Sequence, residues 1–310
     1  MKNLKRIIKF YNINVVDYEL LAKGFASRKW IITDSNHNKY VLKEVDKQPI
    51  NRLKKILNIQ SQLNELSPKI IETKKNKLYS KCENSYYYMC EYIENEPWNI
   101  LYQARNIGTF LAKLHSKMAD IKNEHTSFLK VEDNVELLNE YLNYHKLYNH
   151  TEYVKIIKYK LAVLNKLKMN NIDFNNLTKQ IIHGDFYGDN ILYTESSYKI
   201  IDFDQCCEFY KEYEILRGMF MLSDEVLIKK DKLLLMNEFI KGYYVLNEII
   251  SPEDAYNLYL YIQANSLSSI RPSDYEKEEK RKFAQKRFRI IKFLIENQNE
   301  IIKILNGGYK

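Results

Sequence analysis

The pattern of apolar residues changes once along this chain, and that change limits the folds it can adopt. Up to residue 93 the sequence reads mostly as short strands rich in β-branched and aromatic residues. After the polar stretch Glu94-Asn95-Glu96-Pro97, apolar residues recur at helical spacing, and only residues 180 to 203 return to strand-like sequence. We therefore expect an α+β protein with two lobes: residues 1–95 form a small antiparallel sheet, and residues 96–310 form a mainly helical lobe.

The first lobe is expected to contain several strands and one helix. Three strand-like segments come first, YELLAKG, SRKWIITDS and KYVLKEV, and Asn36-His37-Asn38 predicts a hairpin turn between the last two. Apolar residues at helical spacing predict a helix over residues 51–65, which Ser67-Pro68 ends. The remaining strand-like segments are IIET and NKLYS, which suggest a hairpin, and then SYYYMCEYI.

The charge and the apolar content exclude few function classes by themselves. Residues 1 to 95 hold 18 Lys and Arg against 10 Asp and Glu, which accounts for the whole net charge of +8. Such an excess suits nucleic acid, a membrane surface or a small polyphosphate, but it equally describes a solvated lysine-rich face. No apolar run is long enough to span a bilayer, and residues 1 to 20 lack the features of a signal peptide, so we expect a cytoplasmic protein without a membrane partner.

The segment IIHGDFYGDNILY, residues 181 to 193, places polar side chains on a short loop between two apolar strands. Asp185 follows His183 by two positions, and Asn190 follows Asp185 by five. Loops held by rigid neighbours are common places for catalytic residues. A second segment in which acidic residues follow apolar ones is YKIIDFDQ, where Asp202 comes directly after two isoleucines. We expect its loop and the loop of Asp185 to face each other across a hairpin.

The three polar residues fit a known division of labour. Asn190 and Asp202 offer the oxygen ligands that hard cations such as Mg²⁺ prefer. Asp185 then remains free to accept a proton. In kinase-type phosphoryl transfer, the loop H-x-D-x-x-x-x-N supplies base and metal ligand in this way, and a following Asp holds the metal.

On these residues the chain resembles the aminoglycoside phosphotransferase and choline kinase family, which has the protein-kinase-like fold. The resemblance implies transfer of a phosphoryl group from ATP or GTP, with Mg²⁺, to a hydroxyl of a small molecule. It also implies that Lys43, in the strand YVLK, pairs with nucleotide phosphates, although a surface lysine is the alternative. The turn from Gly24 to Ser27 would cover the phosphates, and the backbone from Glu91 to Ile93 would contact adenine, although an ordinary edge strand is nearly as good a reading.

Two features of this resemblance stay open. The fold normally pairs the strand lysine with a Glu on the first-lobe helix, but residues 51–65 hold no acid before Glu65, so either Glu65 or Gln60 substitutes or the helix lies elsewhere. Asp204 either serves a second metal or caps the next turn, and we favour the cap. His183 is expected to brace the loop.

No peptide-docking segment follows Asp204, so we expect a small soluble acceptor rather than a protein. Acids beyond the metal loop would line the acceptor pocket, or would form a solvated helix face; they are Glu208, Glu212, Glu214, Asp224 and Glu225. Three other functions remain: a metabolite kinase for choline, ethanolamine or homoserine, a catalytically silent protein of the spore-coat type, and a nucleic-acid-binding module. The last lacks any recognisable nucleic-acid motif, and intact acidic residues argue against the silent protein.

Overall fold

The computed structural model describes residues 2–23, 28–45, 49–121, 129, 131, 133–169, 174–194, 197–223, 226 and 228–307. The chain groups into two compact units. The first contains Met1–Asn99, Leu114–Thr126 and His183–Cys206, and the second contains Ile100–Lys113, Ser127–Ile182 and Cys207–Lys310. The predicted catalytic segment is therefore grouped with the strands of the first unit.

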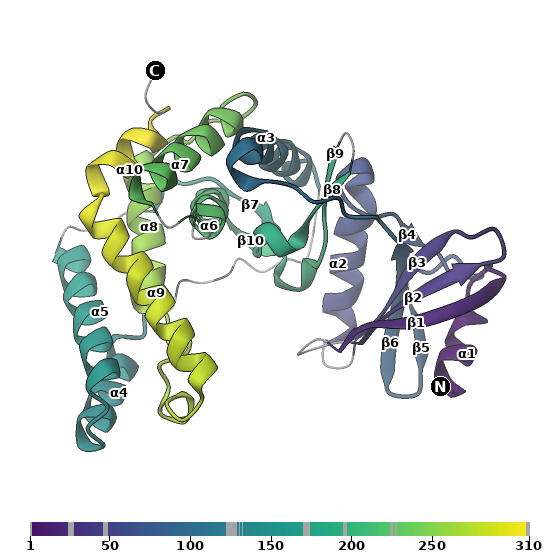
Figure 1. Ribbon diagram of the computed structural model, residues 1–310, viewed down its shortest axis with the longest axis horizontal. Coiled ribbons are helices and arrows are strands. Elements are labelled where there is room, and N and C mark those ends of the chain that lie inside the picture. The colour runs from purple at the N-terminus through teal and green to yellow at the C-terminus, as the bar shows by residue number, and fades with distance from the viewer. Residues whose placement is uncertain are drawn as a thin grey trace. The chain divides into compact units, whose positions relative to one another are not determined.

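A six-stranded antiparallel sheet forms the centre of the first unit (Figure 1). Its strand order is β1-β2-β3-β6-β4, and β5 also pairs with β6. The strands are β1 (Val15–Lys23), β2 (Arg28–Asp34), β3 (Lys39–Val45), β4 (Ile70–Ile71), β5 (Ser80–Cys82) and β6 (Ser85–Glu91). The turn between β2 and β3 forms as predicted, because the Asp34 carboxylate accepts the backbone N–H groups of Asn36 and Asn38 at 2.9 and 2.8 Å.

Two helices cover opposite faces of this sheet. They are α1 (Lys2–Ile8) and α2 (Ile50–Gln62), and α2 is followed by the short helix η1 (Asn64–Leu66). Along β6, Tyr87 and Met89 pack in the cluster that contains α1, whereas Tyr88 packs in the cluster that contains α2. Side chains alternate between the faces of a strand, so these neighbours identify an α1 face and an α2 face.

The strand and helix predictions for the first unit hold with three corrections. The strand predicted over NKLYS lies further along the chain, because β5 spans Ser80–Cys82. The hairpin predicted from IIET and NKLYS is wrong, because β4 and β5 each pair with β6 and not with each other. Strand β6 buries Tyr87, Tyr88 and Met89 in sequence, so both of its faces are covered, and it pairs with β3 along one edge and with β4 and β5 along the other. The N-terminal helix α1 was not predicted, although Leu4 and Ile7 are spaced by three residues and are buried.

The first unit also contains the hairpin that carries the predicted catalytic residues. Strand β8 (Ile191–Thr194) pairs with β9 (Ser197–Ile200) in this hairpin. The short helix η2 (Gly188–Asn190) precedes β8, and the short helix η3 (Phe203–Gln205) follows β9. The residues that follow β6 are tied to this hairpin, because the Tyr193 carbonyl accepts the Glu96 N–H at 2.9 Å and the Tyr193 N–H is donated to the Asn95 side chain at 2.8 Å.

The second unit is mainly helical, as predicted (Figure 1). One strand pair, β7 (Lys179–Ile182) with β10 (Cys207–Tyr210), accompanies its helices. The helix α3 (Ile100–Ala119) belongs to this unit up to Lys113. The other helices are α4 (Val135–Leu147), α5 (Thr151–Met169), α6 (Lys211–Ser223), α7 (Lys229–Tyr243), α8 (Pro252–Asn265), η4 (Pro272–Asp274), α9 (Glu278–Glu296) and α10 (Gln298–Leu305).

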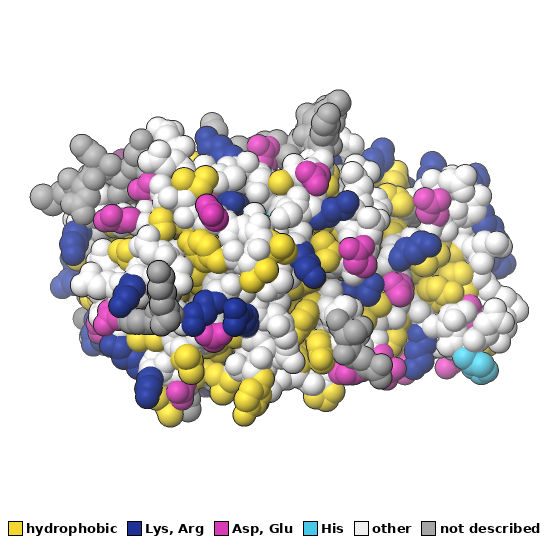
Figure 2. Space-filling model, turned by 90° about the horizontal axis from the view of Figure 1, so that it is seen from above, with side chains coloured by type: hydrophobic (Ala, Val, Ile, Leu, Met, Phe, Trp, Pro, Cys, Tyr) yellow, Lys and Arg dark blue, Asp and Glu magenta, His cyan; other side chains and the backbone are white. Residues whose placement is uncertain are grey.

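The surface and the helices bear on the membrane and nucleic-acid readings. None of the helices within the described ranges is long and apolar enough to cross a membrane. On the face shown in Figure 2, the side chains of Lys and Arg are interspersed with those of Asp and Glu and do not form one continuous basic patch. That face therefore does not show the single stripe of positive charge typical of a nucleic-acid-binding surface.

Candidate active site

The β8–β9 hairpin brings the two predicted metal ligands to the same end. Ile191 lies opposite Ile200 in the hairpin, and the Ile201 N–H is donated to the Asn190 carbonyl at 2.9 Å. Asn190 directly precedes β8, and Asp202 follows Ile201. The prediction that the two polar loops face each other across a hairpin is therefore confirmed.

The side chains of Asp185 and Asn190 are bound to each other. The Asn190 amide nitrogen donates to the Asp185 carbonyl at 2.9 Å and to one Asp185 carboxylate oxygen at 3.1 Å. The nitrogen of this amide therefore faces Asp185, which leaves the amide oxygen as the atom available to a cation. Asn190 is buried, whereas Asp185 is half-buried.

His183 holds the loop from beneath. Its ring is completely buried, and Nε2 donates to the Ile201 carbonyl at 3.0 Å. The ring also packs edge-to-face on Phe203, with ring centroids 4.8 Å apart. These contacts connect the start of the predicted catalytic loop, residues 183–190, to the segment that carries Asp202, which agrees with a bracing role.

Gly184 lets the catalytic loop approach the chain after Asp202. Its φ of +79° lies in the left-handed region, and a Cβ atom placed on it would come within 2.3 Å of the Gln205 carbonyl oxygen. Only a residue without a side chain fits both the conformation and the space. The backbone next to Asp185 is thereby held against η3.

Two lysines form ion pairs with the Asp202 carboxylate. Lys43 Nζ lies 3.0 Å from one carboxylate oxygen of Asp202, and Lys29 Nζ lies 3.3 Å from the other. Burial would raise the pKa of Asp202, but the nearby ammonium groups of Lys43 and Lys29 lower it to about 2. Asp202 also has a left-handed φ of 66°, a conformation that Asp tolerates better than most residues. The carboxylate is therefore ionised over the whole physiological range.

The two lysines come from neighbouring strands of the sheet. Lys29 lies opposite Lys43 in the β2–β3 pair, and Lys43 lies opposite Tyr88 in the β3–β6 pair. Directly paired residues project to the same face, so these side chains lie on the α2 face. Burial would lower the pKa of Lys43, but Tyr88 and the carboxylates of Asp202 and Asp204 raise it above its ordinary value. Lys43 is therefore a buried ammonium ion, not the surface lysine of the alternative reading.

Asp204 is the second carboxylate that contacts Lys43, at 3.0 Å. The preferred reading of Asp204 as a cap is wrong, because Asp202 precedes η3 and the Asp204 side chain binds Lys43. The two proposed substitutes for a helix Glu lie elsewhere: the Gln60 amide donates to the Pro68 carbonyl at 3.1 Å, and Glu65 is exposed on η1. Within the described ranges, Lys43 is paired with acids from the segment after β9 and with none from α2.

The proposed nucleotide-contacting segments are described in part. Gly24 and Ser27 lie outside the described residues. After β6, the Glu91 N–H donates to the Lys69 carbonyl at 2.9 Å and the Tyr92 N–H donates to the Lys39 carbonyl at 3.2 Å. These two backbone donors already have partners, so an adenine contact here would have to use other groups of Glu91 or Ile93.

Two of the five acids expected around the acceptor are buried. Glu212 and Glu214 are fully buried on α6, so a solvated helix face is wrong for both. Glu212 accepts the Thr178 N–H at 3.0 Å, and burial raises its pKa. Glu208 is half-buried, and Asp224 and Glu225 lie outside the described residues. We found no signal in the sequence that distinguishes these buried acids from exposed ones.

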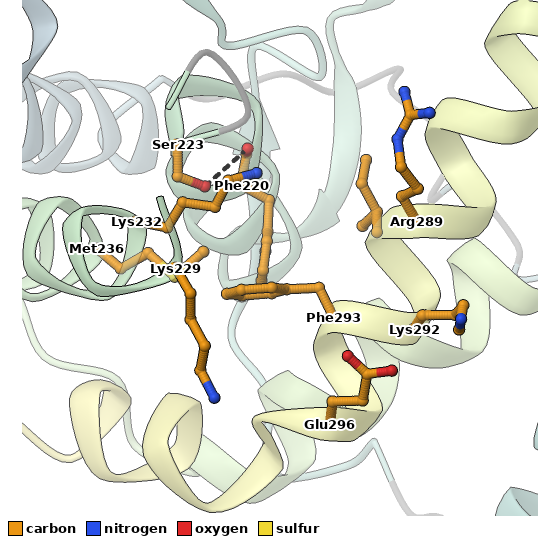
Figure 3. A pocket seen from close by; sticks show the side chains of 10 residues that line it. Phe220, Ser223, Lys229, Lys232, Met236, Arg289, Lys292, Phe293 and Glu296 are labelled. Carbon is orange, nitrogen blue, oxygen red and sulfur yellow. Dashed lines mark hydrogen bonds between the residues drawn. The ribbon is translucent and has the colours of Figure 1, made fainter. Parts of the chain in front are cut away.

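A pocket of about 300 Å³ lies in the second unit, among α6, α7 and α9 (Figure 3). Phe220 and Phe293 meet edge-to-face in it, with ring centroids 6.4 Å apart. The charged groups of Arg289 and Lys292 point away from these rings (Figure 3), whereas Lys232 Nζ lies 5.7 Å from the centroid of the Phe293 ring. The cations around this pocket therefore do not converge on a common point.

Comparison with known proteins agrees with this fold. A model of the phosphotransferase enzyme family matches residues 17–208. An amicoumacin kinase, solved with AMP-PNP and Ca²⁺, is 14% identical with a TM-score of 0.68, over 96% of this chain and 93% of that chain. An aminoglycoside phosphotransferase from Alicyclobacillus acidocaldarius is 14% identical with a TM-score of 0.66, over 96% of each chain.

A choline kinase from Cryptosporidium parvum is similar in the same way. It is 15% identical with a TM-score of 0.61, over 94% of this chain and 92% of that chain. No curated protein matches the sequence. At these identities the solved structures establish the kinase-like fold, and the matching family model covers both Lys43 and the β8–β9 hairpin.

Proposed function

Because this chain belongs to the phosphotransferase enzyme family and is a small-molecule phosphotransferase, we propose that it transfers the γ-phosphoryl group of ATP or GTP to a hydroxyl of a small molecule. The single observation that carries this proposal is the arrangement of Asp185, Asn190 and Asp202 on one hairpin, with Lys43 3.0 Å from Asp202. These are the base, metal-ligand and phosphate-binding groups that phosphoryl transfer requires.

The donor set suits a magnesium ion bound together with nucleotide phosphates. Asp202 offers an ionised carboxylate, and Asn190 offers an amide oxygen whose orientation is fixed by its bonds to Asp185. Among the residues that the structure describes, no group of three or more His, Cys, Asp or Glu side chains could hold a metal alone. Mg²⁺ takes one or two protein ligands and completes its coordination with phosphate oxygens and water, so Asp202 and Asn190 would suffice to hold it. When bound, Mg²⁺ would neutralise the charge of those oxygens.

Asp185 is the proposed base. Its half-buried carboxylate would orient the acceptor hydroxyl and accept its proton. The acceptor oxygen forms a bond to the γ-phosphorus, while the bond from that phosphorus to the oxygen of the β-phosphate breaks and the nucleoside diphosphate leaves. The Asn190 amide binds one oxygen of Asp185 and thereby orients the carboxylate that would accept this proton.

Lys43 would bind the nucleotide phosphates as a point charge. Its position on the α2 face, beside Lys29, supplies two positive charges to the same place. The turn from Gly24 to Ser27 would cover the phosphates, and backbone groups of Glu91 and Ile93 would contact the adenine ring of the nucleotide. The acceptor is proposed to be an aminoglycoside or another small amino alcohol, which rests on the activities in the names of the similar kinases.

The decisive experiment compares Asp185→Asn with wild type. Asn retains an oxygen that can accept the Asn190 amide N–H, so the loop should keep its shape while the base is lost. We expect phosphoryl transfer to fall on the order of 10²- to 10⁴-fold, because general base catalysis is removed. Nucleotide binding, measured by calorimetry, should stay unchanged.

A matched control and a second variant complete this test. Asp189→Asn removes a charge from an exposed position in the same loop and should leave turnover unchanged. Asp202→Asn should abolish the dependence of nucleotide binding on Mg²⁺. A thermal-shift screen of nucleotides, then a panel of aminoglycosides, choline, ethanolamine, homoserine and sugars, identifies the substrates. Near-normal turnover in Asp185→Asn would show that Asp185 is not the base.

A further inference from the structure

Both described ion pairs of the Lys43 ammonium group go to residues that follow the β8–β9 hairpin, and the group also lies 6.0 Å from the centroid of the Tyr88 ring. Only 5% of the Lys43 side chain is exposed, and its two ion pairs within the described ranges go to Asp202 and Asp204, both at 3.0 Å. A buried ammonium group is costly unless it is paired. The position of Lys43 is therefore set by these two carboxylates.

The helix on the same face supplies no acid to this lysine. Every side chain of α2 (INRLKKILNIQSQ) is apolar, neutral or basic. Instead, Arg52 in the first turn of α2 donates to the backbone carbonyl of Asp204 at 2.7 Å. The helix thus contacts Asp204 through a cation, and Asp204 contacts Lys43 through its carboxylate.

We propose that Asp204 is a positioning residue that holds Lys43 in its phosphate-binding position, in place of an acid on the helix. Asp202 cannot do this alone, because its second oxygen is bound by Lys29 and because a carboxylate that ligates a metal shares its charge with that metal. Asp204 balances the charge of this cluster, which then contains two lysines and two aspartates. The positioning role rests on the proposed function, whereas the pairing of Lys43 with Asp204 does not.

The first test separates positioning from metal binding by kinetics. We expect Asp204→Asn to raise the KM for the nucleotide on the order of tenfold, because Lys43 loses one of its two counter-ions. The concentration of Mg²⁺ that gives half-maximal activity, measured at saturating nucleotide, should not change. Asp204→Glu, which keeps the charge, should recover part of the loss.

The matched control is Glu65→Gln, which removes an exposed acid from η1 in the same unit. It should leave both constants unchanged. A shift in the Mg²⁺ requirement of Asp204→Asn without a change in the nucleotide KM would identify Asp204 as a metal ligand and overturn the proposal. Unchanged values of both constants would overturn it as well.

The second test needs no activity and so survives a failure of the proposed function. The unfolding temperatures of Asp204→Asn, Lys43→Met and the double variant form a cycle that measures the coupling between the two side chains. We expect Asp204→Asn to lower the unfolding temperature in wild type and to lower it much less in the Lys43→Met background. Additive effects would show that the two residues are not coupled, whatever the enzyme transfers.

Discussion

Replacing Gly184 by Ala tests how the catalytic loop is built. Two costs add at this position. A residue with a Cβ pays roughly 1–2 kcal/mol for the left-handed backbone. Crowding of a tightly packed contact adds about 1–3 kcal/mol, because the new Cβ would lie 2.3 Å from the Gln205 carbonyl oxygen and backbone must move. We expect the free energy of unfolding to fall by about 2–5 kcal/mol.

Gly307 provides a matched control for the backbone cost. Its φ of +102° is also left-handed, but no atom of the described residues lies within 4 Å of the position that a Cβ would take. Gly307→Ala should therefore cost only the roughly 1–2 kcal/mol of the backbone conformation. The difference between the two variants isolates the contact between Gly184 and Gln205.

Urea unfolding measures both variants. The chain has two tryptophans, Trp30 and Trp98, and both belong to the first unit, so tryptophan fluorescence follows the unit that contains Gly184. Far-UV circular dichroism follows the helices of the second unit, which contains Gly307. If Gly184→Ala costs no more than Gly307→Ala, the close approach to Gln205 does not constrain the loop and this reasoning is wrong.

Three further predictions concern single side chains. Lys43→Met should raise the nucleotide KM on the order of tenfold, about 1.4 kcal/mol, and an unchanged KM in steady-state kinetics would mean that another cation binds the phosphates. Burial lowers the pKa of His145 below its ordinary 6.5, so the second unit should lose stability as the pH falls below 6.5, and urea unfolding at a series of pH values should show that decline. Burial raises the pKa of Glu212 above 4.5, so the protein loses stability as the pH rises and this carboxyl group ionises. The free energy of unfolding of Glu212→Gln, relative to that of wild type, should therefore increase from acid to neutral pH, and a difference that does not change with pH would contradict the raised pKa.

Local spacing was enough to predict the catalytic hairpin. Asp185, Asn190 and Asp202 lie within 18 positions of one another, and two short apolar strands between Asn190 and Asp202 allow one simple pairing. The register Ile191 opposite Ile200 then follows from matching the buried positions. The residues Asn36-His37-Asn38 predicted the β2–β3 turn in a similar way, and the structure closes it locally, because Asp34 binds backbone groups only two and four residues away.

Contacts between distant residues could not be predicted in this way. Asp204 lies 161 positions from Lys43, and nothing in its neighbourhood distinguishes a cap from an ion-pair partner. The contact of Arg52 with the Asp204 carbonyl involves a backbone acceptor, which every residue carries, so it leaves no trace in the sequence. Lys29 is one of 18 basic residues in the first 95, and only the strand register selects it.

The bonding of Asn190 restricts which mutations natural selection can accept there. Its amide must donate toward Asp185 on one side and present an oxygen on the other, so the position requires a donor and an acceptor on one short planar group. Asp would place a second negative charge against Asp185, and Ser or Thr is too short to serve both sides. Gln has the required donor and acceptor, but its side chain is longer by one methylene group and the site is buried, so it would not fit. Among active homologues we therefore expect Asn at position 190 almost without exception, with only synonymous changes in its codon. The neighbouring exposed position, Asp189, should vary in amino-acid type.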